Sequence, residues 1–171
     1  MKQKLILVDH MPYLVNRAGN LVIQLFTRDL AQWDVTVPMW RILAVLGEHG
    51  PQRLVDLALL TSIDVSTLSR TVGTMVRRGF ILRGVAPANR REVVISITAQ
   101  GRKILDKALP SAIRYEQSLI TGLPKKDVEA AKRVLTAMFE RLAEQVGRSP
   151  SMMEPSRKST SRRSSKPQAR K

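Results

Sequence analysis

The stretch that decides the fold lies at residues 64–101 and reads DVSTLSRTVGTMVRRGFILRGVAPANRREVVISITAQG. Apolar residues recur at helical spacing over 65–78, and Gly79 ends that run. Two segments of strand character, 81–86 and 93–97, then flank the turn-like residues 87–91, which include two arginines. A further helix opens at Thr98. A short helix followed by a hairpin with a basic tip predicts a winged helix-turn-helix.

The helix over 65–78 has two distinct faces. The residues expected to face the core are Leu68, Val72, Met75 and Val76. The residues expected to point outward are Ser66, Arg70, Gly73, Thr74 and Arg77, with Thr67 beside them. An ordinary solvated face mixes acids and bases, yet no acidic residue occurs between Ser66 and Arg91. This pattern favours contact with duplex DNA, the helix in the major groove and the wing on phosphate or in the minor groove. The predicted DNA-binding residues are Ser66, Thr67, Ser69, Arg70, Thr74, Arg77, Arg90 and Arg91.

Gly73 is an unusual residue for the middle of a helix. A glycine there costs about 1 kcal/mol relative to alanine. Close approach of a DNA backbone or of a neighbouring helix would explain it, and the sequence leaves both explanations open.

Helices with apolar seams flank this region on both sides. A first helix is expected over 11–32, and a last helix over 124–146. The seam residues are Leu14, Ala18, Leu21 and Leu25 in the first helix, and Val128, Ala131, Leu135, Met138 and Leu142 in the last. Both seams follow the spacing that packs two helices along their length. They predict a dimerisation layer; the alternative is that both helices pack on their own chain.

Shorter elements complete the expected order. Helices are predicted from Thr36 to Gly47 or Gly50, over 53–60, and over 98–121 with a kink or interruption at Pro110. The fold class is therefore mainly α (α+β), a winged helix-turn-helix with terminal helices forming a dimerisation layer. The expected division is 11–34 and 99–147 for dimerisation, 35–98 for DNA binding, and 148–171 as a disordered basic tail.

Charge points to a polyanionic partner. Among 171 residues, 29 Lys and Arg outnumber 14 Asp and Glu, and the formal net charge is +15. Residues 148–171 hold 8 of the basic and 1 of the acidic residues, which suits either an electrostatic arm toward DNA or a solubilising tail.

Other functional classes find little support in the sequence. With no cysteine and two histidines, the chain lacks thiol chemistry, a metal-ligand cluster and any nucleophile or phosphate-loop motif. We therefore expect no enzyme, no metal and no cofactor. No apolar run approaches the roughly 20 residues that cross a bilayer, so we expect a cytoplasmic protein without a membrane partner.

These residues resemble the MarR family of bacterial transcription regulators. The family pattern Ser-x-x-Thr-Arg-x-Val-x-x-Leu, then Gly, is similar to Ser66-x-x-Ser69-Arg70-x-Val72-x-x-Met75, then Gly79. The wing Asp-x-Arg and the following Leu-Thr-x-x-Gly resemble Asn89-Arg90-Arg91 and Ile97-Thr98-Ala99-Gln100-Gly101. The resemblance covers about residues 11–146. Asn89 replaces the family's aspartate, so we expect weaker orientation of the wing arginine.

The resemblance implies a homodimer on a pseudo-palindromic operator, with recognition helices about 34 Å apart. It also implies a repressor that is released from DNA by a small aromatic acid. Candidate ligand-binding residues are Met11, Asn16, Trp40 and Arg41, because tryptophan can stack on a ring and arginine can pair with a carboxylate. The simpler interpretation is a core tryptophan and surface arginines. The alternative function is sequence-independent, nucleoid-type DNA binding.

Overall fold

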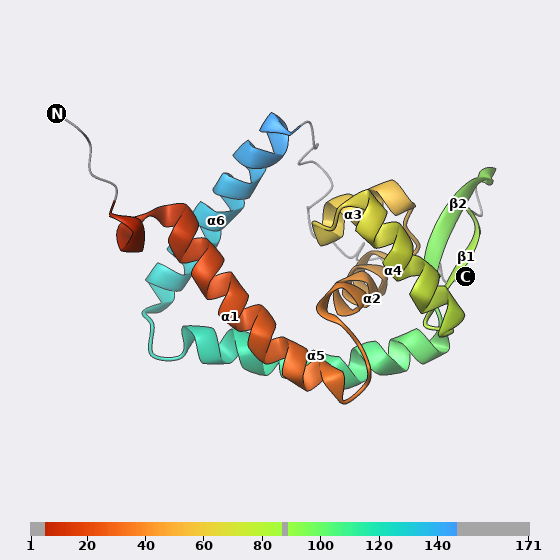
Figure 1. The fold of residues 1–171 in the computed structure, drawn as a ribbon, viewed down its shortest axis with the longest axis horizontal. Coiled ribbons are helices and arrows are strands. Elements are labelled where there is room, and N and C mark those ends of the chain that lie inside the picture. Colours follow the sequence, from red (N-terminus) through yellow and green to blue (C-terminus); the bar gives the residue numbers. More distant parts are fainter. Residues whose placement is uncertain (1–5, 87–88, 147–171) are drawn as a thin grey trace, which may run out of the picture.

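The computed structural model describes residues 6–86 and 89–146, without the side chains of 86 and 89–92. The fold is mostly helical with a two-stranded sheet, which confirms the predicted fold class. Along the chain the elements are η1 (Leu7–Asp9), α1 (Met11–Ala31), α2 (Val37–His49), α3 (Leu54–Thr61), α4 (Val65–Arg77), β1 (Ile81–Ala86), β2 (Asn89–Ile97), α5 (Ala99–Ile120) and α6 (Lys125–Gln145). Figure 1 shows α2, α3, α4 and the hairpin gathered in one lobe, while α1 and α6 extend away from it. The long helix α5 runs along the base of both parts.

Side-chain caps set the starts of three helices. The Thr36 hydroxyl accepts from the Met39 amide at the start of α2, and Asp64 accepts from the Thr67 amide at the start of α4. Thr98 accepts from the Gly101 amide at 3.0 Å to begin α5. Such caps satisfy amide groups that have no partner within the helix. Gly79, with φ of 71°, turns the chain from α4 into the wing.

The wing is longer on its second strand than the sequence indicated. β2 begins at Asn89 rather than at residue 93, and Asn89 pairs with Ala86. The register shifts after Val85, whose partner is Val93, so residues 90–92 lie between two consecutive partners of β1. Pairing close to the tip therefore draws 89–91 out of the expected turn and into a bulged strand. Gln52 adds a short antiparallel bridge to Ile95, through N···O distances of 3.0 and 2.8 Å.

One hydrophobic core lies beneath α4 and the hairpin. Its largest completely buried side chains are Leu30, Ile42, Leu43, Leu46, Leu57, Leu68, Met75, Ile81 and Val72. Leu68, Val72 and Met75 face this core as predicted, but Val76 does not, because 37 % of it is exposed. Val76 falls one residue beyond Met75 on the wheel, and this rotation carries it past the edge of the buried face.

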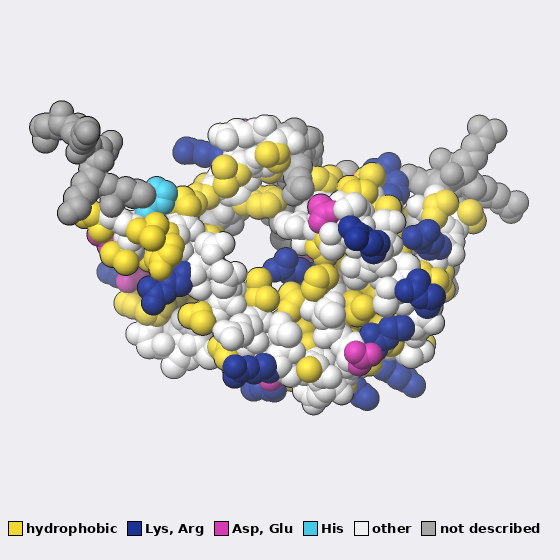
Figure 2. All heavy atoms as spheres, in the orientation of Figure 1, with side chains coloured by type: hydrophobic (Ala, Val, Ile, Leu, Met, Phe, Trp, Pro, Cys, Tyr) yellow, Lys and Arg dark blue, Asp and Glu magenta, His cyan; other side chains and the backbone are white. Residues whose placement is uncertain are grey.

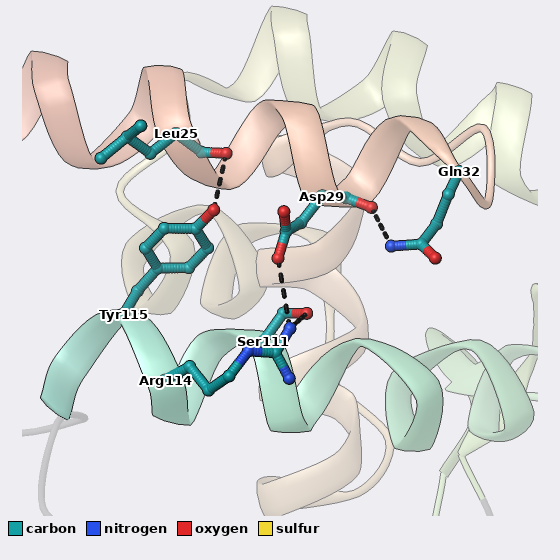
Figure 3. Close-up of polar contacts among 6 residues, drawn as sticks. All are labelled: Leu25, Asp29, Gln32, Ser111, Arg114 and Tyr115. Atoms are coloured by element: carbon teal, nitrogen blue, oxygen red, sulfur yellow. Dashed lines mark hydrogen bonds and ion pairs between the residues drawn. The ribbon is translucent and has the colours of Figure 1, made fainter. Parts of the chain in front are cut away.

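Helix α5 connects the lobe to α1. The Tyr115 hydroxyl donates to the Leu25 carbonyl at 3.0 Å, and the Arg114 guanidinium lies 3.4 Å from the Asp29 carboxylate (Figure 3). Desolvation, reinforced by the Asp29 carboxylate, raises the pKa of Tyr115 above its ordinary value, so this phenol stays a hydrogen-bond donor. The expected interruption at Pro110 is wrong: α5 continues through it from Ala99 to Ile120. Proline removes only one helical hydrogen bond, and packing on both sides of it maintains the rest.

The helices outside the lobe leave apolar surface uncovered. In α6 the buried residue is Ala143, and in α1 the buried residues are Phe26 and Leu30 near its end. The large apolar side chains of these helices that remain exposed are Met11, Leu14, Val15, Leu21, Ile23, Leu25, Val134, Leu135 and Leu142. Among the described residues, no helix is both long enough and apolar enough to cross a membrane.

Candidate nucleic-acid interface

The outward face of α4 starts at its cap. Asp64 Oδ1 accepts from the Ser66 hydroxyl at 2.6 Å and from the Thr67 amide at 2.8 Å. The Ser66 bond, followed by the Thr67 amide, holds the pKa of Asp64 far below its usual range. The Asp64 carboxylate thus orients the Ser66 hydroxyl and anchors the backbone of Thr67 at the start of the helix. The Ser66 oxygen retains lone pairs for an outside donor.

The middle of this face is basic and exposed. Ser66, Ser69, Arg70 and Arg77 are exposed, whereas Thr67 and Thr74 are half-buried. Arg70 Nε lies 3.4 Å from the Ser66 carbonyl, and Arg77 donates to the Thr74 hydroxyl at 3.0 Å. These local bonds lay the arginines along the helix surface without pairing either of them with an acid. Figure 2 shows Lys and Arg side chains gathered on the side of the molecule where α4 and the hairpin lie.

A hollow of about 220 Å³ separates α4 from the wing, lined by Leu54, Ser69, Arg83, Val93 and Ile95. Ser69 and Arg83 bring a hydroxyl and a guanidinium to the same recess from two different elements. Both are exposed. The predicted site omitted Arg83, although its place on β1, opposite Ile95 in the register, could have revealed it. Arg90 and Arg91 belong to β2, but their side chains lie outside the described part of the structure.

Gly73 meets no neighbouring helix. A Cβ placed on it would find one atom within 4 Å, the Nη1 of Arg77 at 3.8 Å, which is ordinary contact. Gly101 is the contrasting case, because a Cβ there would lie 2.0 Å from the Phe80 carbonyl oxygen. Packing within the chain therefore requires glycine at 101 and not at 73. Of the two explanations for Gly73, close approach of a neighbouring helix is wrong.

Two cavities share Trp40, which lies in the first turn of α2. The first, about 390 Å³, is lined by Trp40, Arg41, Ala44, Val45, Leu60, Thr61 and Ser62. The second, about 500 Å³, lies between α2 and α5 and is lined by Trp40, Ala44, Gly47, Glu48, Arg102, Leu105, Asp106, Leu109, Ala112, Ile113 and Glu116. The first contains one cationic side chain and no acid, whereas the second contains three acids and one arginine. Their electrostatic preferences are therefore opposite.

Trp40 and Arg41 both have unused hydrogen-bonding capacity. The Trp40 indole packs edge-on against Phe26, with centroids 4.8 Å apart, and its buried Nε1–H has no partner among the described residues. The half-buried Arg41 forms no hydrogen bond or ion pair with another described residue. A buried donor without an acceptor is costly, whereas the Arg41 guanidinium lines the cavity and can take an outside acceptor.

Met11 and Asn16 do not join Trp40 and Arg41 within one chain. Neither lines a cavity with them; Met11 is half-exposed, and Asn16 accepts from the Asn20 amide at 2.8 Å. At about 1.5 Å rise per residue, the start of α1 lies about 20 Å from Phe26, the α1 residue that contacts Trp40. Within one chain, Met11 and Asn16 therefore do not line the cavity of Trp40 and Arg41, and their role in ligand binding stays a prediction.

Comparison with known proteins agrees with the geometry. Residues 35–93 match the model of the MarR family. The HTH-type transcriptional repressor NicR of Pseudomonas putida is 26% identical over 141 residues, which is 78% of this chain and 89% of NicR.

Two solved structures share the fold. BpsR of Bordetella bronchiseptica, studied for regulation of DNA binding by 6-hydroxynicotinic acid, gives a TM-score of 0.72 at 24% identity over 80% of this chain and 97% of that one. The MepR–DNA complex of S. aureus gives 0.71 at 24% identity over 78% of this chain and 96% of that one.

Proposed function

We propose that this protein is a homodimeric transcriptional repressor that binds a pseudo-palindromic operator and is released by an aromatic carboxylate. The observation that carries the DNA-binding part is the acid-free, exposed basic face of α4 beside Arg83 of the wing. Arginine can bind guanine edges through two hydrogen bonds, and serine can bind bases or phosphates. The proposed contacts are Ser66, Thr67, Ser69, Arg70, Thr74, Arg77, Arg83, Arg90 and Arg91. In the family, a DNA complex has been solved for MepR.

Gly73 supports direct approach of DNA to the middle of α4. No described protein atom other than Arg77 comes near its missing side chain. A glycine in a helix interior costs about 1 kcal/mol relative to alanine. Close approach of a phosphate or base edge to the helix backbone would account for a glycine at this position. In this proposal residues 35–98 form the DNA-binding unit.

The homodimer follows from the uncovered apolar surface of α1, α5 and α6. Leu135 and Leu142 of α6 are 48% and 57% exposed, although they lie on the seam expected from the sequence. A second copy would cover these seams and hold two α4 helices at the spacing of successive major grooves. The proposed dimerisation region is 11–34 with 99–147; residue 147 and the tail at 148–171 lie outside the described residues.

The effector would occupy the cavity that Trp40 shares with Arg41. Arg41 has no ionic partner among the described residues, so a carboxylate would complete its hydrogen bonding. The Trp40 indole, which lines the same cavity, would contact the aromatic ring of the ligand. The neighbouring cavity is unsuited to an anion because Glu48 and Asp106 lie on its rim. A ligand that favours an arrangement of the dimer in which the two DNA-binding lobes do not fit the operator would release DNA by population shift.

The decisive experiment measures binding to the protein's own upstream promoter fragment and to a length-matched random duplex at two salt concentrations. A preference for the promoter that persists at the higher salt supports a sequence-specific regulator. Equal binding that collapses with salt supports the alternative of a sequence-independent DNA-binding protein, which the net charge of +15 favours. A chain ending at Gly147 sharpens the result, because a regulator keeps its discrimination without the basic tail.

The effector is tested on the promoter complex with 6-hydroxynicotinic acid and with its neutral amide. We expect the acid to release DNA and the amide to be weaker, because Arg41 pairs with a carboxylate. Arg41→Gln should abolish release by the acid while operator affinity stays unchanged. Arg102→Gln, in the neighbouring cavity, is the matched control and should still respond. Equal responses of the two variants would remove the ligand from the Arg41 cavity.

A further inference from the structure

Arg78 lies in the DNA-binding region, but its side chain is bound within the chain and does not face outward. It follows α4 directly, and its side chain is 27% exposed. Its guanidinium pairs with the Asp34 carboxylate at 3.0 Å and also donates to the Asp34 backbone carbonyl. The same group lies 3.8 Å from the Met39 sulfur and 4.5 Å from the centroid of the Phe80 ring. One side chain therefore contacts the α1–α2 connection, the first turn of α2 and the start of the wing.

The backbone at both ends of this contact is constrained. Asp34 has a φ of 53°, which is uncommon for a residue with a side chain, and Gly79 next to Arg78 has a φ of 71°. Arg78 thus joins two tight turns, one at the end of α1 and one at the end of α4. A planar guanidinium has several hydrogen-bond donors in fixed directions, so it can hold two turns in one relative orientation.

The other dimerisation helix is attached at the same place. Thr98, the cap of α5, has its hydroxyl 2.7 Å from the Gly79 carbonyl oxygen and 3.0 Å from that of Phe80. Gly101 allows α5 to begin against the Phe80 carbonyl, where a Cβ would come within 2.0 Å. Residues 78–80, which we name the α4–β1 junction, therefore contact both the α1–α2 connection and the start of α5.

We propose that Arg78 is a positioning residue that fixes the angle of α4 relative to the frame formed by α1 and α5. It acts through Asp34 rather than on DNA, because its guanidinium is held by the carboxylate and the backbone carbonyl of Asp34. Its neighbour Arg77 is exposed and has no acidic partner, so the two adjacent arginines have different roles. The effect of Arg78 on operator choice rests on the proposed DNA-binding function. Its effect on the angle between α4 and α1 does not depend on that function.

The angle is tested without DNA. Since the chain has no cysteine, Gln24→Cys on α1 and Ser69→Cys on α4 give two specific spin-label sites, both exposed. Labelled protein diluted with unlabelled protein reports the α1–α4 distance within one chain. We expect Arg78→Gln to broaden or shift this distribution, Arg78→Lys to restore part of it, and Arg77→Gln to leave it unchanged. An Arg78→Gln distribution that matches the parent overturns the proposal, whatever the protein does with DNA.

The effect of Arg78 on operator choice is measured as the ratio of the affinities for two DNA duplexes. Each variant is measured on the operator and on the same operator with one base pair inserted between half-sites. We expect Arg78→Gln to reduce this ratio by about fivefold or more, with the slope of binding against salt unchanged. Partial unfolding cannot mimic this result, because it lowers both affinities equally. Arg77→Gln should lower the salt slope and keep the ratio; an Arg78→Gln variant that does the same is a phosphate contact and contradicts the proposal. If the parent chain prefers no operator, the proposed function fails, while the label experiment still decides the role of Arg78.

Discussion

The lobe formed by α2, α3, α4 and the hairpin and the helices outside it use leucine in opposite ways. Leu57 and Leu68 in the lobe are 0% exposed, whereas Leu135 and Leu142 in α6 are 48% and 57% exposed. The lobe buries a set of its large apolar residues within its own chain, although Leu82 of β1 is 47% exposed, so the stability of this core is a property of one molecule. The outer helices have apolar seams with no cover in the described chain, so under the proposed function we expect their stability to depend on a second copy.

The largest effect should come from a charge in the uncovered seam. Leu135→Glu places a carboxylate where the proposed partner helix packs, and the dimer should dissociate. Operator affinity should then fall about 100- to 10,000-fold, because two linked half-site contacts become independent. Sedimentation velocity and operator binding on the same sample measure both effects.

Ala137→Glu provides the matched control for that variant. Ala137 is exposed on the face of α6 opposite Leu135, and the substitution adds the same charge to the same helix. It should leave both the dimer and operator affinity intact. Dissociation by both variants would mean that the helix itself fails, and dissociation by neither would place the dimer interface elsewhere.

One substitution made in both regions sharpens the comparison further. Leu68→Ala removes a completely buried side chain and should lower the free energy of unfolding by about 2–5 kcal/mol at any protein concentration. Leu142→Ala should shift the thermal midpoint by an amount that grows as the protein is diluted, because it weakens association. Calorimetry over a hundredfold range of concentration separates these cases. If Leu142→Ala lowers the thermal midpoint by the same amount at every protein concentration, Leu142 packs in the core of its own chain.

Arg70→Ala tests the outward face of the lobe. We expect operator binding to weaken by about 1–3 kcal/mol, with preference relaxed at one base position, because Arg70 is exposed in the middle of α4. Arg28→Ala, an exposed arginine of α1, removes the same charge away from that face and should change little. Titrations against single-base operator variants supply the measurement. An equal loss on operator and random duplex would restrict Arg70 to phosphate contact.

Local signals predicted much of the fold. Thr36 and Thr98 cap the helices that were expected to begin at them, and Gly79 ends α4, because capping depends on a few neighbouring residues. The start of β2 was misplaced because pairing near the tip depends on register across the hairpin, which residue type alone does not encode.

The parts of the site that depend on tertiary contact were beyond the sequence. Nothing in the spacing of Asp34 and Arg78 indicates that they meet, since the two residues lie 44 positions apart in the sequence and α2, α3 and α4 lie between them. The side-chain type of Arg41 predicted contact with a carboxylate, and the structure adds that Arg41 lines a cavity without an acid. Met11 was also predicted to bind the ligand, yet the length of α1 separates it from that cavity.

The smallest predicted effect concerns Gly73, where stability and binding should change in opposite directions. No neighbouring element obstructs a methyl group there, so Gly73→Ala should raise the free energy of unfolding by about 1 kcal/mol. Operator affinity should fall, because the methyl group would stand where DNA lies against the backbone of α4. Denaturant titration and operator binding on one preparation measure the two quantities. A variant that is more stable and binds as tightly as the parent would show that DNA does not approach α4 at Gly73, and the outward face would then contact DNA mainly through its arginines.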